Sequence, residues 1–231
     1  MQSLIIHMPS ATARRANVDR LLATLPDAQV VQAENGAGLD SAPGNLQRPH
    51  YPFAMGAGEI GCTLSHRKCW QYIVDSGDDY ALIAEDDLQV DPPIWPNVMA
   101  LIAAYMTPDH FIRLPAKARE IAAQDIARDG VARLFLPKVI GLQTVCQVVG
   151  RNAAQRLLDA TTTLDRPIDT FLQMHWVHGQ PIHTILPNGV AELTADLGGS
   201  TIQKKTRTSG KLAREFKRFK YRRAVNARPQ R

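Results

Sequence analysis

The feature that most constrains the fold is a run of apolar residues that ends in three consecutive carboxylates. Residues 80–84 read YALIA, and Glu85, Asp86 and Asp87 follow directly. A continuous apolar run of this length is typical of a strand covered on both faces, as in the sheets of α/β proteins. Ligands of such sheets bind beyond the carboxyl ends of the strands. The run therefore predicts a buried strand that delivers acidic side chains to a ligand site.

Strand and helix patterns alternate along the chain, which favours an α/β fold with a parallel sheet. The segment 37–57 is rich in Gly, Pro and polar residues and is expected to be a long loop. Apolar runs predict strands at 3–8, 28–33, 80–84, 111–114, 132–136, 144–149 and 182–187, and amphipathic spacing predicts helices at 11–25, 58–77, 94–106, 151–161 and 166–177.

The length and composition of the chain limit the classes of protein to which it can belong. The chain has 231 residues, of which 45% are hydrophobic, and this suits one domain with a tail. Its apolar runs are shorter than the ~18 residues of a transmembrane helix, and its first ten residues lack the basic start of a signal peptide. We therefore expect a cytoplasmic protein. The three cysteines, Cys62, Cys69 and Cys146, form no CxxC motif and are expected to be reduced thiols.

The three carboxylates could form a metal site. Adjacent carboxylates repel each other, and a divalent cation would offset that repulsion. Hard oxygen ligands suit Mg2+ or Mn2+, which usually keep several waters and bridge to phosphates of a substrate. Spacing does not decide which of Glu85, Asp86 and Asp87 would face the ion. A solvated acidic turn is the commoner explanation of a bare cluster of this kind, so the residues alone leave both interpretations open.

A longer motif surrounds this cluster. Residues 58–87 read GEIGCTLSHRKCWQYIVDSGDDYALIAEDD. They resemble the hallmark of glycosyltransferase family 25, the bacterial lipopolysaccharide and lipooligosaccharide glycosyltransferases. Shorter similarities follow the family order: LIIHMPSATARR, VVQAENG, GLQTVCQVVGRNAAQRLLDAT, RPIDTFL and GGSTIQ. The resemblance covers residues 1–203, taken as a catalytic domain, and leaves 204–231 as a basic tail. His7 stands where the family often has Asn, which puts in doubt a polar contact near the nucleotide.

The resemblance implies a GT-A type fold, a nucleotide-binding α/β sandwich with a mostly parallel central sheet flanked by helices. It implies an inverting, metal-dependent glycosyltransferase that moves a hexose, most often galactose, from a UDP-sugar to a lipopolysaccharide, lipooligosaccharide or other surface glycan. The carboxylates resemble the DxD element of that fold, which holds Mn2+ (or Mg2+) against the donor diphosphate. Asp87 is then the direct metal ligand, and Glu85 and Asp86 are ligands or ribose contacts. A non-catalytic protein of the same fold that binds a nucleotide sugar or glycan is the alternative.

Five further residues are candidates for the donor site. Arg14 and Arg15 follow the first predicted strand, and arginine forks suit phosphate oxygens, although both could lie on a solvated helix start. Ser65 and His66 of the LSH motif and Glu59 lie on the helix before the acidic strand. A Ser–His pair on a helix is often structural, and Glu59 could cap the helix instead of binding sugar hydroxyls.

An inverting displacement needs a base for the acceptor hydroxyl, and a carboxylate is the usual choice. Asp169, in RPIDTF, is our candidate. It is expected near a helix start, where the helix dipole favours a carboxylate, so it could equally cap that helix or orient the acceptor. His183 could supply a late metal ligand, or could be a satisfied histidine of the sheet.

The tail has a charge opposite to that of the body. From Thr201 onward there are twelve Lys or Arg and one acid, whereas the first 200 residues carry a net charge of −6. Leu212, Phe216 and Phe219 would share a helix face rimmed by basic residues, a pattern typical of a membrane-surface helix. We expect the tail to dock on anionic lipid at the cytoplasmic face of the inner membrane, near a lipid-linked glycan acceptor. A solubilising disordered tail and nucleic-acid binding are the alternatives, and the acidic body disfavours nucleic acid.

Overall fold

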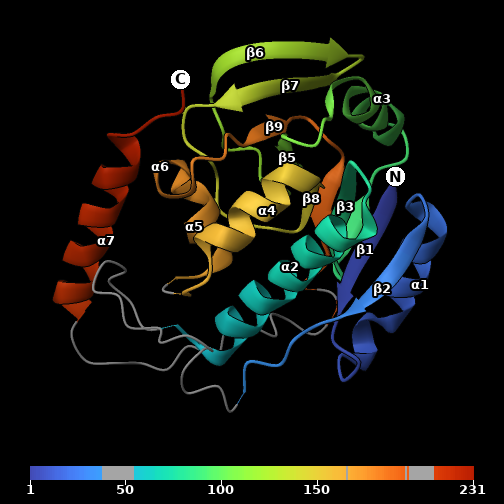
Figure 1. Cartoon of the computed structure of the whole chain (residues 1–231), viewed down its shortest axis with the longest axis horizontal. Helices are drawn as coiled ribbons and strands as arrows, with labels where there is room; N and C mark the ends of the chain where they lie inside the picture. The colour runs from blue at the N-terminus through green and yellow to red at the C-terminus, as the bar shows by residue number, and fades with distance from the viewer. Residues whose placement is uncertain (38–54, 165, 196, 198–210) are drawn as a thin grey trace.

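The computed structural model describes residues 1–37, 55–164, 166–195, 197 and 211–231, with backbone only for residues 211–214. It has an eight-stranded central sheet in the order β2-β1-β3-β8-β5-β9-β7-β6, with helices on both faces (Figure 1). The sequence-based expectation of an α/β sandwich flanked by helices is confirmed. Most of the expected loop at 37–57, the GGSTIQ segment and the first residues of the tail lie outside the described residues.

The first three strands of the sheet run parallel to one another. Strand β1 (Gln2–His7) lies between β2 (Ala28–Gln32) and β3 (Tyr80–Glu85). The chain crosses from β1 to β2 through a short 3-10 helix (Thr12–Arg14) and α1 (Arg15–Thr24). Because β2 and β3 lie on opposite sides of β1, the crossover direction reverses there. The gap between the carboxyl ends of β1 and β3 is the place where α/β sheets bind ligands.

The rest of the sheet is mixed. β8 (Cys146–Gly150) lies antiparallel between β3 and β5 (Phe111–Arg113). β9 (His183–Ile185) runs parallel to β5, and β7 (Ala132–Pro137) and β6 (Ala122–Asp129) form an antiparallel hairpin at the edge. The parallel character is therefore confined to β2-β1-β3 and β5-β9. The β6–β7 ladder carries two register shifts, between 122 and 124 and between 125 and 127.

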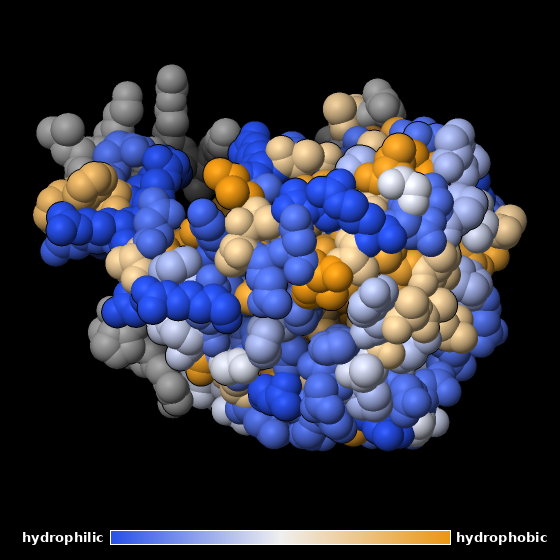
Figure 2. Space-filling model, turned by 90° about the horizontal axis from the view of Figure 1, so that it is seen from above, coloured by the Kyte–Doolittle hydropathy of each residue, from blue (hydrophilic) through white to orange (hydrophobic). Residues whose placement is uncertain are grey.

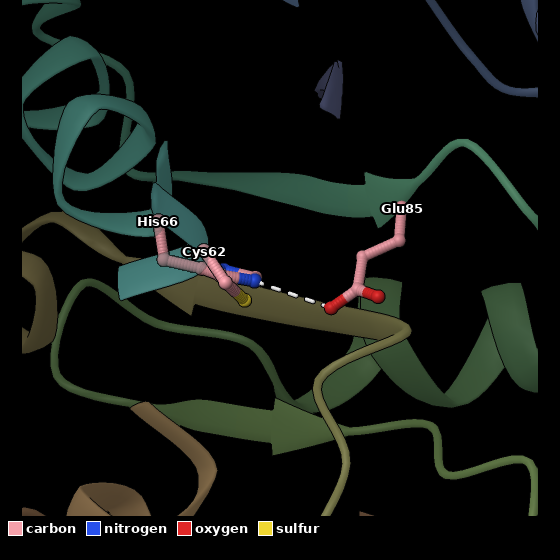
Figure 3. A group of neighbouring side chains, drawn as sticks. All are labelled: Cys62, His66 and Glu85. Carbon is pink, nitrogen blue, oxygen red and sulfur yellow. Dashed lines mark hydrogen bonds and ion pairs between the residues drawn. The ribbon is translucent and has the colours of Figure 1, made fainter. Parts of the chain in front are cut away.

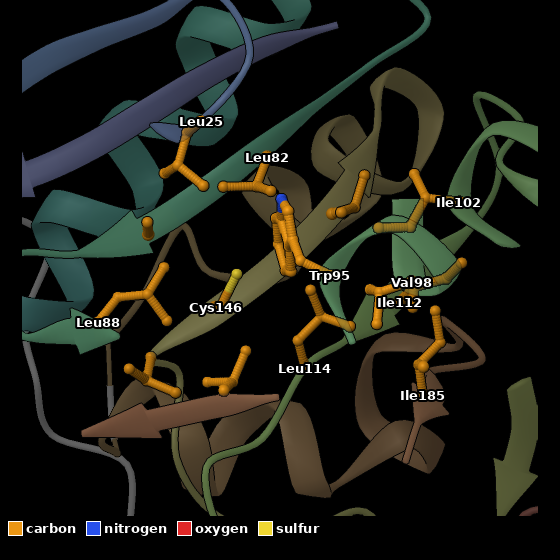
Figure 4. Close-up of a cluster of buried hydrophobic side chains, with 14 of the residues drawn as sticks. Leu25, Leu82, Leu88, Trp95, Val98, Ile102, Ile112, Leu114, Cys146 and Ile185 are labelled. Carbon is orange, nitrogen blue, oxygen red and sulfur yellow. The ribbon is translucent and has the colours of Figure 1, made fainter. Parts of the chain in front are cut away.

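Alternation along the buried strands divides the core into two layers. In β3, Leu82 and Ala84 face α1 and α3 (Trp95–Tyr105), in the layer that contains Trp95 and Cys146 (Figure 4). Ala81 and Ile83 face the opposite layer, which packs under α2 (Ala57–Ser76), α4 (Arg151–Ala160) and α5 (Ile168–Gln173). Side chains of a strand alternate between the two faces of a sheet, so a strand that is buried on both faces must be apolar throughout.

A second, small sheet forms beside the carboxyl end of β3. β4 (Leu88–Val90) pairs antiparallel with β10 (Val190–Glu192). Just beyond this pair, the Leu193 amide donates to the carbonyl of Asp87 at 2.9 Å. The pairing brings residues 192–194 next to the acidic cluster, although about one hundred residues separate them in the chain.

The C-terminal segment contains a helix that packs partly on the body. α7 (Lys211–Asn226) leaves Phe216 and Phe219 about 60% exposed, but Val225 and Gln230 are buried. Tyr221 donates its hydroxyl to Gln173 of α5 at 2.6 Å. The end of the chain therefore packs against the body through these residues, while Phe216 and Phe219 on α7 stay exposed. Within the described residues no helix is long and apolar enough to cross a bilayer.

The helix expected at 166–177 is divided into α5 and α6 (His175–His178). Met174 between them adopts φ −93° and ψ 58°, which is outside the helical region. The division turns His178 inward, where its Nε2 lies 3.1 Å from the Leu172 carbonyl. Burial lowers the pKa of His178 to about 4.

Candidate active site

A cleft of about 370 Å3 lies at the carboxyl ends of the three parallel strands. Its walls come from the residues that follow each strand: Met8 after β1, residues 33–37 after β2, and Glu85, Asp86 and Asp87 at the end of β3. The N-terminal half of α2 forms another wall through Gly58, Gly61, Cys62, Ser65 and His66, and Glu192 and Thr194 close the far side. The acidic cluster therefore lies in a cleft at the point where the strand order reverses. This is the position in which α/β sheets bind ligands.

Asp86 is held inside the protein by two basic side chains. His7 Nδ1 lies 2.8 Å from one carboxylate oxygen, and Arg14 donates to the other at 2.5 Å. Burial alone would lower the pKa of Arg14, but its hydrogen bond and charge pairing with Asp86 outweigh burial and raise it. His7 thus forms an internal partner of Asp86. Both oxygens of Asp86 are engaged, which fits a structural support better than a ligand.

Asp87 has a different environment. One carboxylate oxygen accepts from the Thr194 hydroxyl at 2.6 Å and lies 3.1 Å from Arg14. The other, Oδ1, is buried and has no hydrogen-bond partner among the described residues. Burial raises the pKa of Asp87, and the negative charge of Glu85 adds to this effect. A buried carboxylate oxygen with an open lone pair beside a cleft fits a divalent cation, because a cation would supply the missing partner.

Glu85 faces α2 across the floor of the cleft (Figure 3). Its Oε1 accepts from the Thr144 hydroxyl at 2.6 Å and lies 3.4 Å from Nε2 of His66. Burial would raise the pKa of Glu85, but the hydrogen bonds from His66 and Thr144 lower it below its ordinary value. On the other side of the imidazole, the Gln147 amide lies 2.8 Å from His66 Nδ1. Glu85 therefore remains ionised in the cleft.

The start of α2 is fixed against the loop after β2. Ser65 donates to the Gly61 carbonyl at 2.7 Å and accepts from the Glu34 amide at 2.8 Å. A methyl group on Gly61 would lie 2.6 Å from the Glu34 carbonyl oxygen, so only glycine permits this approach. Glu59 accepts from the Gly56 amide at 2.7 Å, which caps the first turn of the helix. Ser65 and Glu59 thus shape the wall of the cleft.

Other candidates lie outside the lining of this cleft. Arg15 is exposed and pairs with Asp19 at 2.9 Å along α1, so Arg14 and Arg15 separate, and only Arg14 reaches the carboxylates. His183 lies in a second pocket, where its ring packs edge-on against His110 with centroids 5.4 Å apart. Burial lowers the pKa of His183. These positions give Arg15 and His183 no contact with the acidic cluster.

Asp169 lies in the first turn of α5 and accepts hydrogen bonds within that turn. Its Oδ1 accepts from the Thr170 amide at 2.6 Å, which is a helix-start contact. Burial raises the pKa of Asp169, and the charge of Glu85 contributes to the increase. The structure therefore brings Asp169 into the electrostatic environment of Glu85, beside the cleft but outside its lining.

Several residues of the site carried no signal in the sequence. Asn17 donates from α1 to the backbone carbonyls of Asp86 and Leu88, both at 2.9 Å, and fixes the turn after β3. Glu192 lines the cleft and accepts from Gln143 at 3.0 Å. Because both residues lie far from the EDD motif in the chain, no local pattern indicated these contacts.

The start of α2, in contrast, did carry a signal in the sequence. Residues 56–61 have the spacing G-x-G-x-x-G, which is a weak indicator that a helix N-terminus approaches an anion.

Comparisons with known proteins agree with this geometry. The model of the family described as "Glycosyltransferase family 25 (LPS biosynthesis protein)" matches residues 1–172. Procollagen galactosyltransferase 2 of Homo sapiens is 26% identical over 192 residues, covering 72% of this chain and 29% of that protein. A glycosyltransferase 25 family member of Drosophila pseudoobscura pseudoobscura is 28% identical over 128 residues, covering 55% of this chain and 16% of that protein. The chain thus spans less than a third of the length of these relatives.

Proposed function

The chain belongs to glycosyltransferase family 25, and we propose that it is a metal-dependent, inverting glycosyltransferase that uses a UDP-sugar. In this proposal it transfers a hexose, galactose in the first instance, to a lipopolysaccharide, lipooligosaccharide or other surface glycan. The observation that carries the proposal is Oδ1 of Asp87, which is buried on the wall of the cleft beyond the end of β3 and has no hydrogen-bond partner in the described part of the chain.

We assign metal binding to Asp87 and to Glu85. The ion, Mn2+ or Mg2+, would neutralise charge on the leaving nucleoside diphosphate. Asp86 supports this pair from behind, because its ion pairs hold Arg14 against Asp87. The first turn of α2 also lines the cleft, where the N-terminal end of a helix dipole favours an anionic group. Together these groups suit a diphosphate bound between α2 and the end of β3.

Two carboxylates compete for the role of base. We propose Asp169, because burial raises its pKa toward the range in which a carboxylate accepts a proton efficiently. Glu192 is the competitor, because it lines the cleft and burial raises its pKa too. Asn and Gln substitutions would separate them: the base variant should lose transfer to the acceptor yet keep metal-dependent UDP-sugar binding. If Glu192→Gln alone has that effect, Asp169 is not the base.

The donor assignment is tested by incubating the protein with Mn2+ and a panel of UDP-sugars, followed by mass spectrometry of released UDP. We expect metal-dependent release from UDP-galactose and its loss, by at least about 100-fold, in Asp87→Asn, by analogy with removal of one charge-stabilising group. Asp19→Asn, which removes an exposed carboxylate on α1, is the matched control and should retain the activity. Release that does not depend on metal, or that survives Asp87→Asn, would contradict the proposal.

We further propose that α7 docks the enzyme on an anionic membrane surface near its glycan acceptor. Phe216 and Phe219 are exposed, and Lys220 lies 4.7 Å from the ring centre of Phe216. Figure 2 shows this apolar surface over α7, at the left, surrounded by hydrophilic residues. Each basic residue near an anionic leaflet contributes about 1 kcal/mol. Pelleting with phosphatidylserine vesicles should fall in a Phe216→Ser, Phe219→Ser double variant, and unchanged pelleting would refute the role of α7.

A further inference from the structure

Three side chains of different chemistry converge on the floor of the cleft. Cys62 and His66 project from successive turns of α2, and Glu85 meets them from the end of β3 (Figure 3). One thiol sulfur, one ring nitrogen and one carboxylate oxygen all lie within 4.8 Å of one another. We propose that these residues form a binding site for a borderline transition-metal ion of the Zn2+ class, which shares Glu85 with the hard-metal site proposed at Asp87 and Glu85.

The spacing suits a tetrahedral ion. Zn–N and Zn–O bonds of about 2.0–2.1 Å place two tetrahedral ligands about 3.3 Å apart. His66 Nε2 and Glu85 Oε1 are 3.4 Å apart, so they already hold this separation. The Cys62 sulfur lies within 4.8 Å of the other two ligand atoms, and a turn of its side chain would bring it within the Zn–S bond length of about 2.3 Å. Three protein ligands leave a fourth position, which would point into the cleft that all three residues line.

Gln147 supplies an independent indication. Its amide nitrogen lies 2.8 Å from His66 Nδ1, and its buried Oε1 has no hydrogen-bond partner among the described residues. If the Gln147 side-chain amide is turned by 180°, its Oε1 accepts a hydrogen bond from the Nδ1–H group of His66, and the lone pair of His66 Nε2 faces Cys62 and Glu85. A metal-bound histidine usually donates its second N–H to such an oxygen. The same rotation therefore satisfies the unpartnered oxygen and prepares His66 as a ligand.

The ligand set selects the class of metal. A thiolate and an imidazole favour Zn2+ or Co2+ over Mg2+ and Mn2+, which prefer oxygen. Binding would release one proton from the Cys62 thiol to solvent, while the imidazole stays neutral and keeps one proton on Nδ1. Glu85 would then serve this ion instead of the hard cation at Asp87. That last consequence rests on the proposed function, whereas the binding site itself does not.

Cobalt titration of the full chain tests the site directly. Co2+ bound to a thiolate gives a charge-transfer absorption band in the near ultraviolet, and Zn2+ should abolish it by displacement. We expect one Co2+ per chain in the wild-type protein and no band in Cys62→Ser. Cys69→Ala is the matched control, because Cys69 lies two turns further along α2 in the core, and it should retain the band. Gln147→Met should weaken Co2+ affinity by about 10–100-fold, as expected for loss of an outer-shell partner.

The outcomes separate this inference from the proposed function. Absence of the band in the wild-type protein, or its persistence in Cys62→Ser, would overturn the metal site. Circular dichroism of each variant confirms that a lost band does not reflect unfolding. If the protein binds Co2+ through Cys62 but transfers no sugar, this metal site stands and the proposed function is refuted. If the protein transfers sugar but shows no Cys62-dependent Co2+ band, the proposed function stands and this metal site is refuted.

Discussion

Asp86 and Asp87 are adjacent aspartates, yet from the structure we expect their substitution by asparagine to affect different properties, the stability of the fold for Asp86 and the activity for Asp87. Asp86→Asn removes the charge that holds Arg14 and His7, both of which are buried. Asp87→Asn removes a carboxylate whose ionised form burial disfavours, and an asparagine oxygen can still accept from Thr194. The first substitution should therefore affect the stability of the fold, and the second should affect the activity.

The magnitudes follow from the contacts. Breaking a buried ion pair by removing one partner costs about 3–5 kcal/mol. Because Asp87 remains 3.1 Å from Arg14 as a second partner, we expect Asp86→Asn to lower the free energy of unfolding by an amount at the lower end of this range. In a chain of this length 1 kcal/mol shifts the midpoint of thermal unfolding by about 2–4 °C. The midpoint of thermal unfolding of Asp86→Asn should thus lie about 6–12 °C below that of the wild-type protein. Asp87→Asn should change the midpoint by less than about 4 °C, in the direction of higher stability.

Thermal unfolding followed by circular dichroism, with and without Mn2+ and UDP, measures both effects. A ligand present at 100 times its dissociation constant stabilises the fold by about 2.7 kcal/mol, so the wild-type midpoint should rise on addition. The rise should be absent in Asp87→Asn. Equal destabilisation by the two substitutions, or a Mn2+-dependent rise that survives Asp87→Asn, would refute the division of roles between the two carboxylates.

Three further substitutions test the surroundings of the site. Gly61→Ala should cost about 1–3 kcal/mol in urea unfolding because its methyl group meets the Glu34 carbonyl; a neutral result would contradict the close packing of α2. Gln230→Ala should cost about 1–3 kcal/mol because the buried Ile182 amide loses its acceptor, and unchanged stability would mean that the C-terminus is undocked. Burial raises the pKa of Asp169 in the fold, so its stabilising contribution is full below the ordinary carboxylate pKa and decreases as pH rises. Asp169→Asn should therefore gain stability relative to the wild type as the pH rises above about 4, the ordinary pKa of an aspartate, and a constant difference would contradict this assignment.

The sequence predicted the buried parts of the fold because they leave strong patterns. The apolar run at 80–84 became β3, and the helix expected at 58–77 became α2, with boundaries within one residue. Strand β6 was missed because most of its residues are exposed, so no apolar run or strict alternation marks it. The short pair β4 and β10 was missed because each strand has three residues and is defined only by its partner.

The candidate site was predictable in position but not in detail. Residues of the EDD motif and of the LSH motif line the same cleft at the carboxyl end of β3. Which carboxylate oxygens have hydrogen-bond partners among the described residues depends on side chains that lie far away in the chain. Arg14 reaches Asp86 from 72 residues away, and Thr194 reaches Asp87 from 107 residues away. No local pattern encodes such distances, and only folding sets them.

The outer strand β6 is where this sheet could recruit another chain. An uncovered strand offers free amides and carbonyls to any neighbouring extended segment, and long flat edges tend to aggregate. Here the two register shifts kink the strand, and charged residues such as Asp125, which pairs with Arg133, crowd its exposed surface. A docking strand would meet an irregular, charged border with few consecutive pairing positions. The edge formed by β6, at the opposite end of the sheet from β2, is therefore poorly suited to pairing with a strand of another molecule.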